Sequence, residues 1–354
     1  MTGAAGRAAI VALLLALASC GGLPCRPAAF YAPPADAPYG AQEVRVATPA
    51  GHVLAGTLTR PTGPAAPPAV VLITGSKAQD RDMVGSTDPL VSRYRPFHQI
   101  ADTLGRRGIA VLRLDDRGTA CSSGGDLAAA DTADRAGDTR AAVAFLRARP
   151  DIDGRRLGLL GISEGADIAI MVAAGDPGLA AVVTMAATAA PGWQVWKHQV
   201  RYLISRGEEM DPDQKARWRA GEDPERILDE RVAQARAHVA AGRAGAWWTF
   251  FFDHDPLPAA RRVRAPVLVL HGDKDSSVPV DHAGKLARAL RTAGNRDVTV
   301  ILYPDHNHLF LPDREGGFRD YARVLARTQR IPDGVLRDIA GWLADRLAAP
   351  AGLG

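Results

Sequence analysis

Short apolar runs alternate with amphipathic stretches along most of the chain. The runs are rich in Val, Leu and Ile, and the stretches between them repeat apolar residues at helical spacing. This alternation predicts βαβ units, and therefore an α/β fold with a mostly parallel central sheet flanked by helices. The predicted strands are residues 70–73, 109–114, 156–160, 181–185, 265–272 and 298–303. The clearest predicted helices are residues 98–106, 132–149 and 334–347.

Two segments depart from the alternation. Residues 43–59 alternate polar and apolar side chains around a Pro-Ala-Gly turn, which predicts an antiparallel hairpin at a sheet edge. Residues 191–253 are helical in composition and hold five of the six tryptophans, so we expect a helical insertion there. Its aromatic rings have two interpretations. They line an apolar pocket, or they dock the insertion onto the sheet domain.

The pentapeptide Gly161-Ile162-Ser163-Glu164-Gly165 lies between the strand at 156–160 and an apolar helical run at 166–174. A Gly-x-Ser-x-Gly between strand and helix is typical of a nucleophile elbow. The turn is sharp, and glycines avoid the collisions that a Cβ would cause. The helix that follows points its N–H groups and positive dipole end at the serine, where an oxyanion can form. The pattern predicts that Ser163 is a catalytic nucleophile.

Candidate partners of Ser163 follow two later strands. Asp275 comes after the strand at 265–272, and His308 comes after the strand at 298–303. Ser, then Asp, then His is the chain order of α/β hydrolases. Each residue follows the carboxyl end of its strand, where open α/β sheets place their active sites. In such a triad the serine attacks, the histidine moves the proton, and the aspartate orients the imidazole.

Each partner has a rival in the sequence. Asp273 competes with Asp275, although the spacing before the next helix favours Asp275 and suits Asp273 to loop capping. His306 competes with His308, whose neighbours Leu309-Phe310 can pack it down. The His-x-His pair could instead bind a metal, because histidine is a common transition-metal ligand. No further His or Cys cluster is evident in the sequence, and we expect no metal.

The N-terminus has the pattern of an export signal. A basic residue precedes a short apolar run, and Leu17-Ala18-Ser19-Cys20 resembles a bacterial lipobox. We therefore expect a lipoprotein signal peptide at 1–20 with lipidation at Cys20; an ordinary cleaved signal peptide and a secreted protein are the alternative. Residues 21–41 are rich in Pro and Ala, which predicts a tether without core residues. Cys25 and Cys121 can pair in an oxidising envelope or stay free.

The combined motifs resemble a bacterial α/β-hydrolase family related to the serine-aminopeptidase and dienelactone-hydrolase-like branches, from about residue 44 to residue 347. The resemblance implies an α/β-hydrolase core at 42–190 and 254–348, with a helical cap at 191–253. It also supports His308 over His306. The matching pieces are Ile73-Thr74-Gly75-Ser76-Lys77-Ala78-Gln79-Asp80-Arg81-Asp82, Arg113-Leu114-Asp115-Asp116-Arg117-Gly118, the elbow, Phe252-Asp253-His254-Asp255-Pro256 and Asn307-His308-Leu309-Phe310.

The same resemblance implies an oxyanion hole made of backbone N–H groups. One would come from Ser76 or Lys77 and the other from Glu164. Members of the family usually carry Gly where this chain has Lys77, and a Gly-containing step where it has Ala120-Cys121. These departures concern the shape of the pocket more than the triad. The Lys77 side chain either points to solvent or reaches an anionic group of the substrate.

These observations predict a lipid-anchored serine hydrolase of the bacterial cell envelope that cleaves small carboxylic esters or acyl substrates without a cofactor. The alternatives are an aminopeptidase or acyl-peptidase, with Glu208 and Glu209 as candidates for binding a substrate ammonium, and a non-catalytic binding protein. The net charge is +4, and the basic residues are scattered among acidic ones. They therefore form no stripe that would bind nucleic acid. The oligomeric state is not predicted.

Overall fold

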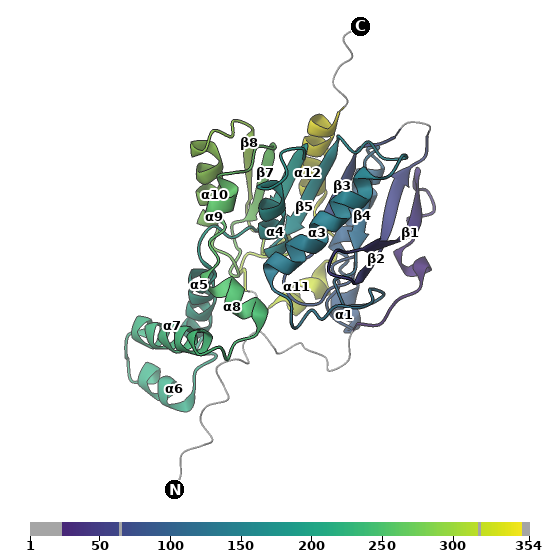
Figure 1. Ribbon diagram of the computed structural model, residues 1–354. Coiled ribbons are helices and arrows are strands. Elements are labelled where there is room, and N and C mark those ends of the chain that lie inside the picture. Colours follow the sequence, from purple (N-terminus) through teal and green to yellow (C-terminus); the bar gives the residue numbers. More distant parts are fainter. Residues whose placement is uncertain (1–22, 64–65, 318–319, 349–354) are drawn as a thin grey trace.

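A single mixed sheet forms the centre of the computed structural model, which describes residues 23–63, 66–317 and 320–348 (Figure 1). In the described chain the sheet has eight strands, in the order β1-β2-β4-β3-β5-β6-β7-β8. In this sheet order, the six strands from β4 through β3 to β8 are parallel. The pairs β1–β2 and β2–β4 are antiparallel. The predicted edge hairpin and parallel sheet are confirmed. The strands are β1 (Tyr39–Ala47), β2 (Val53–Pro61), β3 (Ala69–Ile73), β4 (Ala110–Leu114), β5 (Leu157–Ile162), β6 (Ala181–Met185), β7 (Val267–Gly272) and β8 (Val298–Tyr303).

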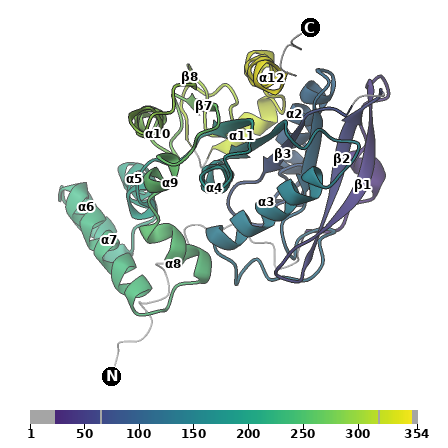
Figure 2. The same ribbon diagram turned by 45° about the horizontal axis from the view of Figure 1, so that its top comes forward.

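Helices cover both faces of the sheet (Figure 2). Successive side chains of a strand point to opposite faces, so each strand contributes to two apolar clusters. In β3, Val71 and Ile73 belong to one cluster, and Val70 and Leu72 belong to the other. The first cluster is completed by α3 (Thr132–Arg147), α4 (Glu164–Ala173), α9 (Leu257–Ala260) and α10 (Asp281–Thr292). The second is completed by α1 (Pro89–Ser92), α2 (Pro96–Gly105), α11 (Tyr321–Arg327) and α12 (Asp333–Leu347).

The segment between β6 and β7 forms a separate helical layer, with α6 and α7 projecting away from the sheet (Figure 2). This layer consists of the first four helices of the segment, α5 (Gly192–Ser205), α6 (Pro212–Arg219), α7 (Pro224–Ala240) and α8 (Ala246–Asp253), whereas α9 packs against the sheet. Trp196 is buried in an apolar cluster made only of residues from this layer, and its ring centroid lies 5.8 Å from that of Trp248. Trp193 and Trp218 pack against the same cluster. Four of the five tryptophans therefore hold the cap helices to one another.

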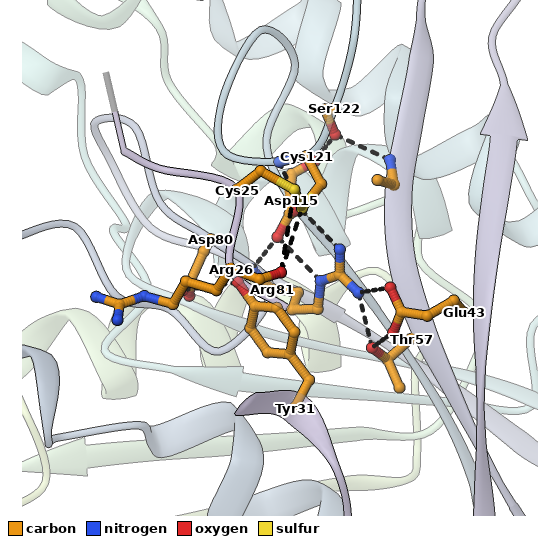
Figure 3. Close-up of a disulfide and its surroundings, with 11 residues drawn as sticks. Cys25, Arg26, Tyr31, Glu43, Thr57, Asp80, Arg81, Asp115, Cys121 and Ser122 are labelled. Atoms are coloured by element: carbon orange, nitrogen blue, oxygen red, sulfur yellow. Dashed lines mark hydrogen bonds and ion pairs between the residues drawn. A yellow bond between two sulfur atoms is a disulfide. The ribbon is translucent and has the colours of Figure 1, made fainter. Parts of the chain in front are cut away.

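The described part of the predicted tether is not a free spacer, and that expectation was wrong. Tyr31, in a short 3-10 turn (Ala28–Tyr31), is 1% exposed, and its hydroxyl donates to Asp80 at 3.3 Å. The Arg81 guanidinium lies 4.2 Å from the centre of the Tyr31 ring (Figure 3). The aromatic pair Phe30-Tyr31 among Pro and Ala has no periodic pattern, so the sequence gave no sign of this contact.

A disulfide fixes the same segment to the core. Cys25 and Cys121 are bonded, which resolves the two alternatives left open for them (Figure 3). The bond closes a loop with a sequence separation of 96. In the chain-entropy account a loop of this size destabilises the unfolded chain by about 4–5 kcal/mol. The bond therefore contributes to stability as well as anchoring residues 23–38.

The predicted signal peptide at 1–20 and its lipidation site Cys20 lie outside the described residues. Within the part of the chain that the structure describes, no helix is long and apolar enough to cross a membrane.

Candidate active site

Ser163 lies on a sharp turn between β5 and α4. Its backbone is strained, with φ of 56° and ψ of −125°. The turn is so tight that a Cβ added at Gly161 would lie 2.0 Å from the carbonyl oxygen of Gly165. A Cβ added at Gly165 would lie 2.2 Å from the carbonyl oxygen of Ile73, at the end of β3. Both glycines are therefore required by close approach of backbone atoms, as the elbow pattern predicts. Ser163 itself is half-buried.

Asp275 and His308 meet at the same edge of the sheet as Ser163. They follow β7 and β8, whose carboxyl ends lie beside those of β5 and β6 because these strands are parallel. His308 Nδ1 is 2.7 Å from Asp275 Oδ2. Among the described residues no hydrogen bond joins Ser163 to His308. Catalytic hydrogen bonds are often loose until substrate binds, so this geometry is compatible with a triad.

The Asp275 carboxylate is buried and fully hydrogen-bonded. Oδ1 accepts the backbone N–H groups of Ser277 and Val278 at 2.8 and 2.9 Å, and Oδ2 faces His308. Burial opposes ionisation of this carboxyl, but His308 and the hydrogen bond from His271 outweigh it and hold its pKa well below the usual range. Asp275 is therefore an anion at neutral pH, as the orienting role requires.

His271 is a neighbour of this pair that sequence analysis missed. It is fully buried at the end of β7, and its Nε2 lies 3.3 Å from Asp275 Oδ2 and 3.1 Å from the Val278 carbonyl oxygen. Both neighbours are acceptors, so Nε2 carries the proton and donates it. No sequence pattern marks His271 for this contact. It lies near Asp275 because β7 ends there and the chain turns back.

The rival residues have other partners. Asp273 accepts the N–H of Asp305 at 2.7 Å, which is the loop-bracing role expected of it. His306 Nδ1 lies 2.6 Å from the carbonyl oxygen of Pro304, and its ring packs against Tyr303. Throughout the described residues, no group of three or more His, Cys, Asp or Glu could hold a metal ion. The geometry thus favours Asp275 and His308 among the alternatives.

The predicted oxyanion donors lie on either side of Ser163. Ser76 and Lys77 follow β3, and a Cβ added at the preceding Gly75 would lie 3.5 Å from Ser163 Cβ. Glu164 is the first residue of α4, so its N–H lies at the free end of that helix. Lys77 is exposed, while partial burial of its ammonium group lowers its pKa, and both interpretations of this side chain stay open.

Two of the positions that resemble family glycines, Lys77 and Ala120, have a strained backbone in this chain. Lys77 has φ of 72° and Ala120 has φ of 49°, a region that glycine adopts without steric cost. At these two positions the backbone conformation itself favours glycine. In this chain the surrounding contacts must hold both residues in place.

The cap reaches the site through α5. Gln199 Nε2 on this helix donates to the carbonyl oxygen of Ser277 at 3.0 Å, two residues after Asp275. The neighbouring His198 is half-buried, and burial lowers its pKa despite the charge of Asp275. The base of the cap is thus fixed to the loop that carries Asp275.

Comparison with known proteins identifies the protein family. Residues 90–315 match the model of the serine aminopeptidase S33 family, and the chain belongs to that family. It is 27% identical over 293 residues to esterase EstD of Thermotoga maritima, covering 82% of this chain and 65% of EstD. It is 33% identical over 121 residues to a putative carboxymethylenebutenolidase of Yersinia pestis, covering 29% of this chain and 45% of that protein. The chain thus spans less than two thirds of these curated relatives.

Solved structures agree on the fold. An esterase from Pyrococcus furiosus has a TM-score of 0.54 at 15% identity, covering 88% of this chain and 94% of the esterase. The alpha/beta hydrolase GrgF from Penicillium sp. sh18 has a TM-score of 0.57 at 17% identity, covering 87% of this chain and 99% of GrgF. The predicted α/β-hydrolase fold is confirmed, and the chain is a member of a hydrolase family.

Proposed function

We propose that this protein is a serine esterase that cleaves small carboxylic esters through an acyl-enzyme. The observation that carries the proposal is the hydrogen bond between His308 Nδ1 and the buried, ionised Asp275, at the sheet edge that also holds the strained Ser163 elbow. A carboxylate in this position fixes the imidazole with Nδ1 protonated and Nε2 free to accept a proton. The likeness to esterase EstD supports an ester substrate.

The chemistry follows from these roles. Ser163 Oγ attacks the ester carbonyl while His308 Nε2 takes the hydroxyl proton. The negative oxygen is held by the N–H of Glu164 and that of Ser76 or Lys77. His308 then gives its proton to the departing alkoxide, leaving an acyl-enzyme. Water attacks the acyl group with His308 again as base, which releases the carboxylic acid and restores Ser163.

The proposed peptidase alternative has weaker support within this chain. Glu208, a candidate for binding a substrate ammonium, forms an ion pair with Arg206 at 3.0 Å, and both side chains are more than one-third exposed. Such exposed pairs are ordinary surface contacts. Because the matching family is described as serine aminopeptidases, the test below includes peptidase substrates.

The test is hydrolysis of p-nitrophenyl acetate, butyrate, octanoate and palmitate beside a panel of aminoacyl p-nitroanilides, with Ser163→Ala as the matched control. We expect ester turnover that disappears in the variant, and a preference among the chain lengths that reports the size of the pocket under the cap. Anilide turnover without ester turnover would replace the proposal with the peptidase reaction. Absence of any Ser163-dependent turnover would contradict the esterase proposal.

We also propose that the enzyme works in the bacterial envelope, anchored through a lipid at Cys20. The Cys25–Cys121 bond supports an oxidising compartment, because disulfides persist there and are rare in the cytosol. In the bacterium that makes this protein, the wild type is expected in the membrane fraction and Cys20→Ser in the soluble fraction. Equal partition of the two proteins would contradict the anchor.

A further inference from the structure

A buried ionic network connects the two sides of the candidate oxyanion hole. On one side is the oxyanion loop, defined as residues 75–78. On the other is the N-terminus of α4, where Glu164 provides the second N–H. The network consists of Asp116 after β4, Arg135 on α3 and the Glu164 side chain, whose exposed fractions are 10%, 7% and 4%. Charges buried to this degree cost desolvation energy, which their ion pairs and hydrogen bonds must offset.

Asp116 holds both ends of the oxyanion loop. Its Oδ1 accepts the hydroxyl of Thr74 at 2.6 Å, and its Oδ2 accepts the N–H of Gln79 at 2.9 Å. The Asp116 N–H also donates to the carbonyl oxygen of Gln79 at 3.1 Å. One residue therefore fixes the positions immediately before and after the loop. Such support is needed because Lys77, inside the loop, has a left-handed backbone.

Arg135 joins this loop to the nucleophile helix. Its Nη2 donates to Thr74 Oγ1 at 2.9 Å and lies 3.3 Å from Asp116 Oδ1, while its Nη1 donates to Glu164 Oε2 at 2.9 Å. Thr132, one turn earlier on α3, donates to the other Glu164 oxygen at 2.7 Å. A guanidinium has a rigid planar fork, so it fixes the separation of the groups that it bridges.

We propose that Asp116 and Arg135 are positioning residues for the oxyanion hole, which set the distance between the N–H groups of the oxyanion loop and the N–H of Glu164. The inference rests on the proposed serine-esterase function. Hydrogen-bond donors stabilise an oxyanion only when they are held at the place where its charge develops. The network supplies that constraint from outside the pocket, without touching the substrate.

The test compares Asp116→Asn, Arg135→Gln and the milder Arg135→Lys with Arg117→Gln. Arg117 is the matched control because it is similarly buried and forms a bidentate ion pair with Asp138 on the same helix as Arg135. For each protein we would measure kcat and KM for an ester, the inhibition constant of an alkyl boronic acid, the unfolding midpoint, and amide hydrogen exchange at residues 75–78 and 164.

We expect Asp116→Asn and Arg135→Gln to lower kcat by about 10- to 100-fold, with KM nearly unchanged. This decrease in kcat is no larger than the decrease caused by removing one oxyanion donor. The boronic acid, which forms a tetrahedral adduct with serine, should bind more weakly by the same factor. Amide exchange at the loop should accelerate. Arg135→Lys should lie between these variants and the wild type, and Arg117→Gln should change only the unfolding midpoint.

The result that overturns the inference is unchanged loop exchange in the Asp116 and Arg135 variants, together with kcat and boronic-acid affinity equal to those of Arg117→Gln. Failure of the proposed function has a different signature, because the wild type would then lack Ser163-dependent hydrolysis. In that case amide exchange alone decides whether the network positions the loop.

Discussion

Replacing Ser163, His308 or both with alanine is expected to lower kcat for ester hydrolysis by the same factor, about 10⁶, because nucleophile and base act as one unit. Without the imidazole, the hydroxyl of Ser163 keeps its proton and is a poor nucleophile. Without the hydroxyl, His308 has no proton to take. Once either is lost, removing the other costs nothing more. The remaining activity reflects substrate binding and the oxyanion donors.

The measurement is kcat for the two single variants and the double variant, on protein whose folded state is checked by circular dichroism. His306→Ala is the control because its ring contacts Pro304 and Tyr303 instead of Asp275, and its kcat should stay within about fivefold of the wild type. Additive losses in the double variant would contradict the shared role. A requirement for His306, combined with inhibition by chelators, would favour the metal interpretation of the His-x-His pair.

The sequence predicts the parts of this fold that repeat a simple pattern. Buried parallel strands are continuous apolar runs, and the elbow needs glycines at two fixed positions, so both are visible without coordinates. Because a parallel sheet brings its carboxyl ends to one edge, the chain order Ser, Asp, His is enough to predict that Ser163, Asp275 and His308 lie together. Their catalytic roles remain predictions for the experiments above.

Contacts that depend on a single side chain could not be predicted in this way. Tyr31 buries its ring beside Arg81, although its neighbours in sequence suggest an exposed spacer. His271 reaches Asp275 only because the loop after β7 folds back on the strand end. Arg135 lies on a helix whose sequence alternates charges like a solvent-exposed one, yet its side chain is only 7% exposed. Such residues obtain their partners from the tertiary fold, which has no periodic trace in the sequence.

Replacing Asp275 with asparagine is expected to lower kcat by about 10⁴-fold while leaving the fold intact. The amide can be placed in two orientations, and the structure decides between them. If its NH₂ occupied the Oδ1 position, it would face the N–H groups of Ser277 and Val278, leaving two buried donors unpaired. The oxygen must therefore take that position, and the NH₂ is directed at His308.

An NH₂ group directed at His308 Nδ1 forces that nitrogen to accept, which moves the imidazole proton to Nε2. The imidazole then presents a donor to Ser163 and cannot act as its base. His271 adds to the loss, since its Nε2–H would also face the new NH₂ group instead of a carboxylate. Asp273→Asn is the matched control, because its carboxylate braces Asp305, and we expect a change of no more than about twofold. A 10⁴-fold loss in Asp273→Asn with normal turnover in Asp275→Asn would instead assign the orienting role to Asp273.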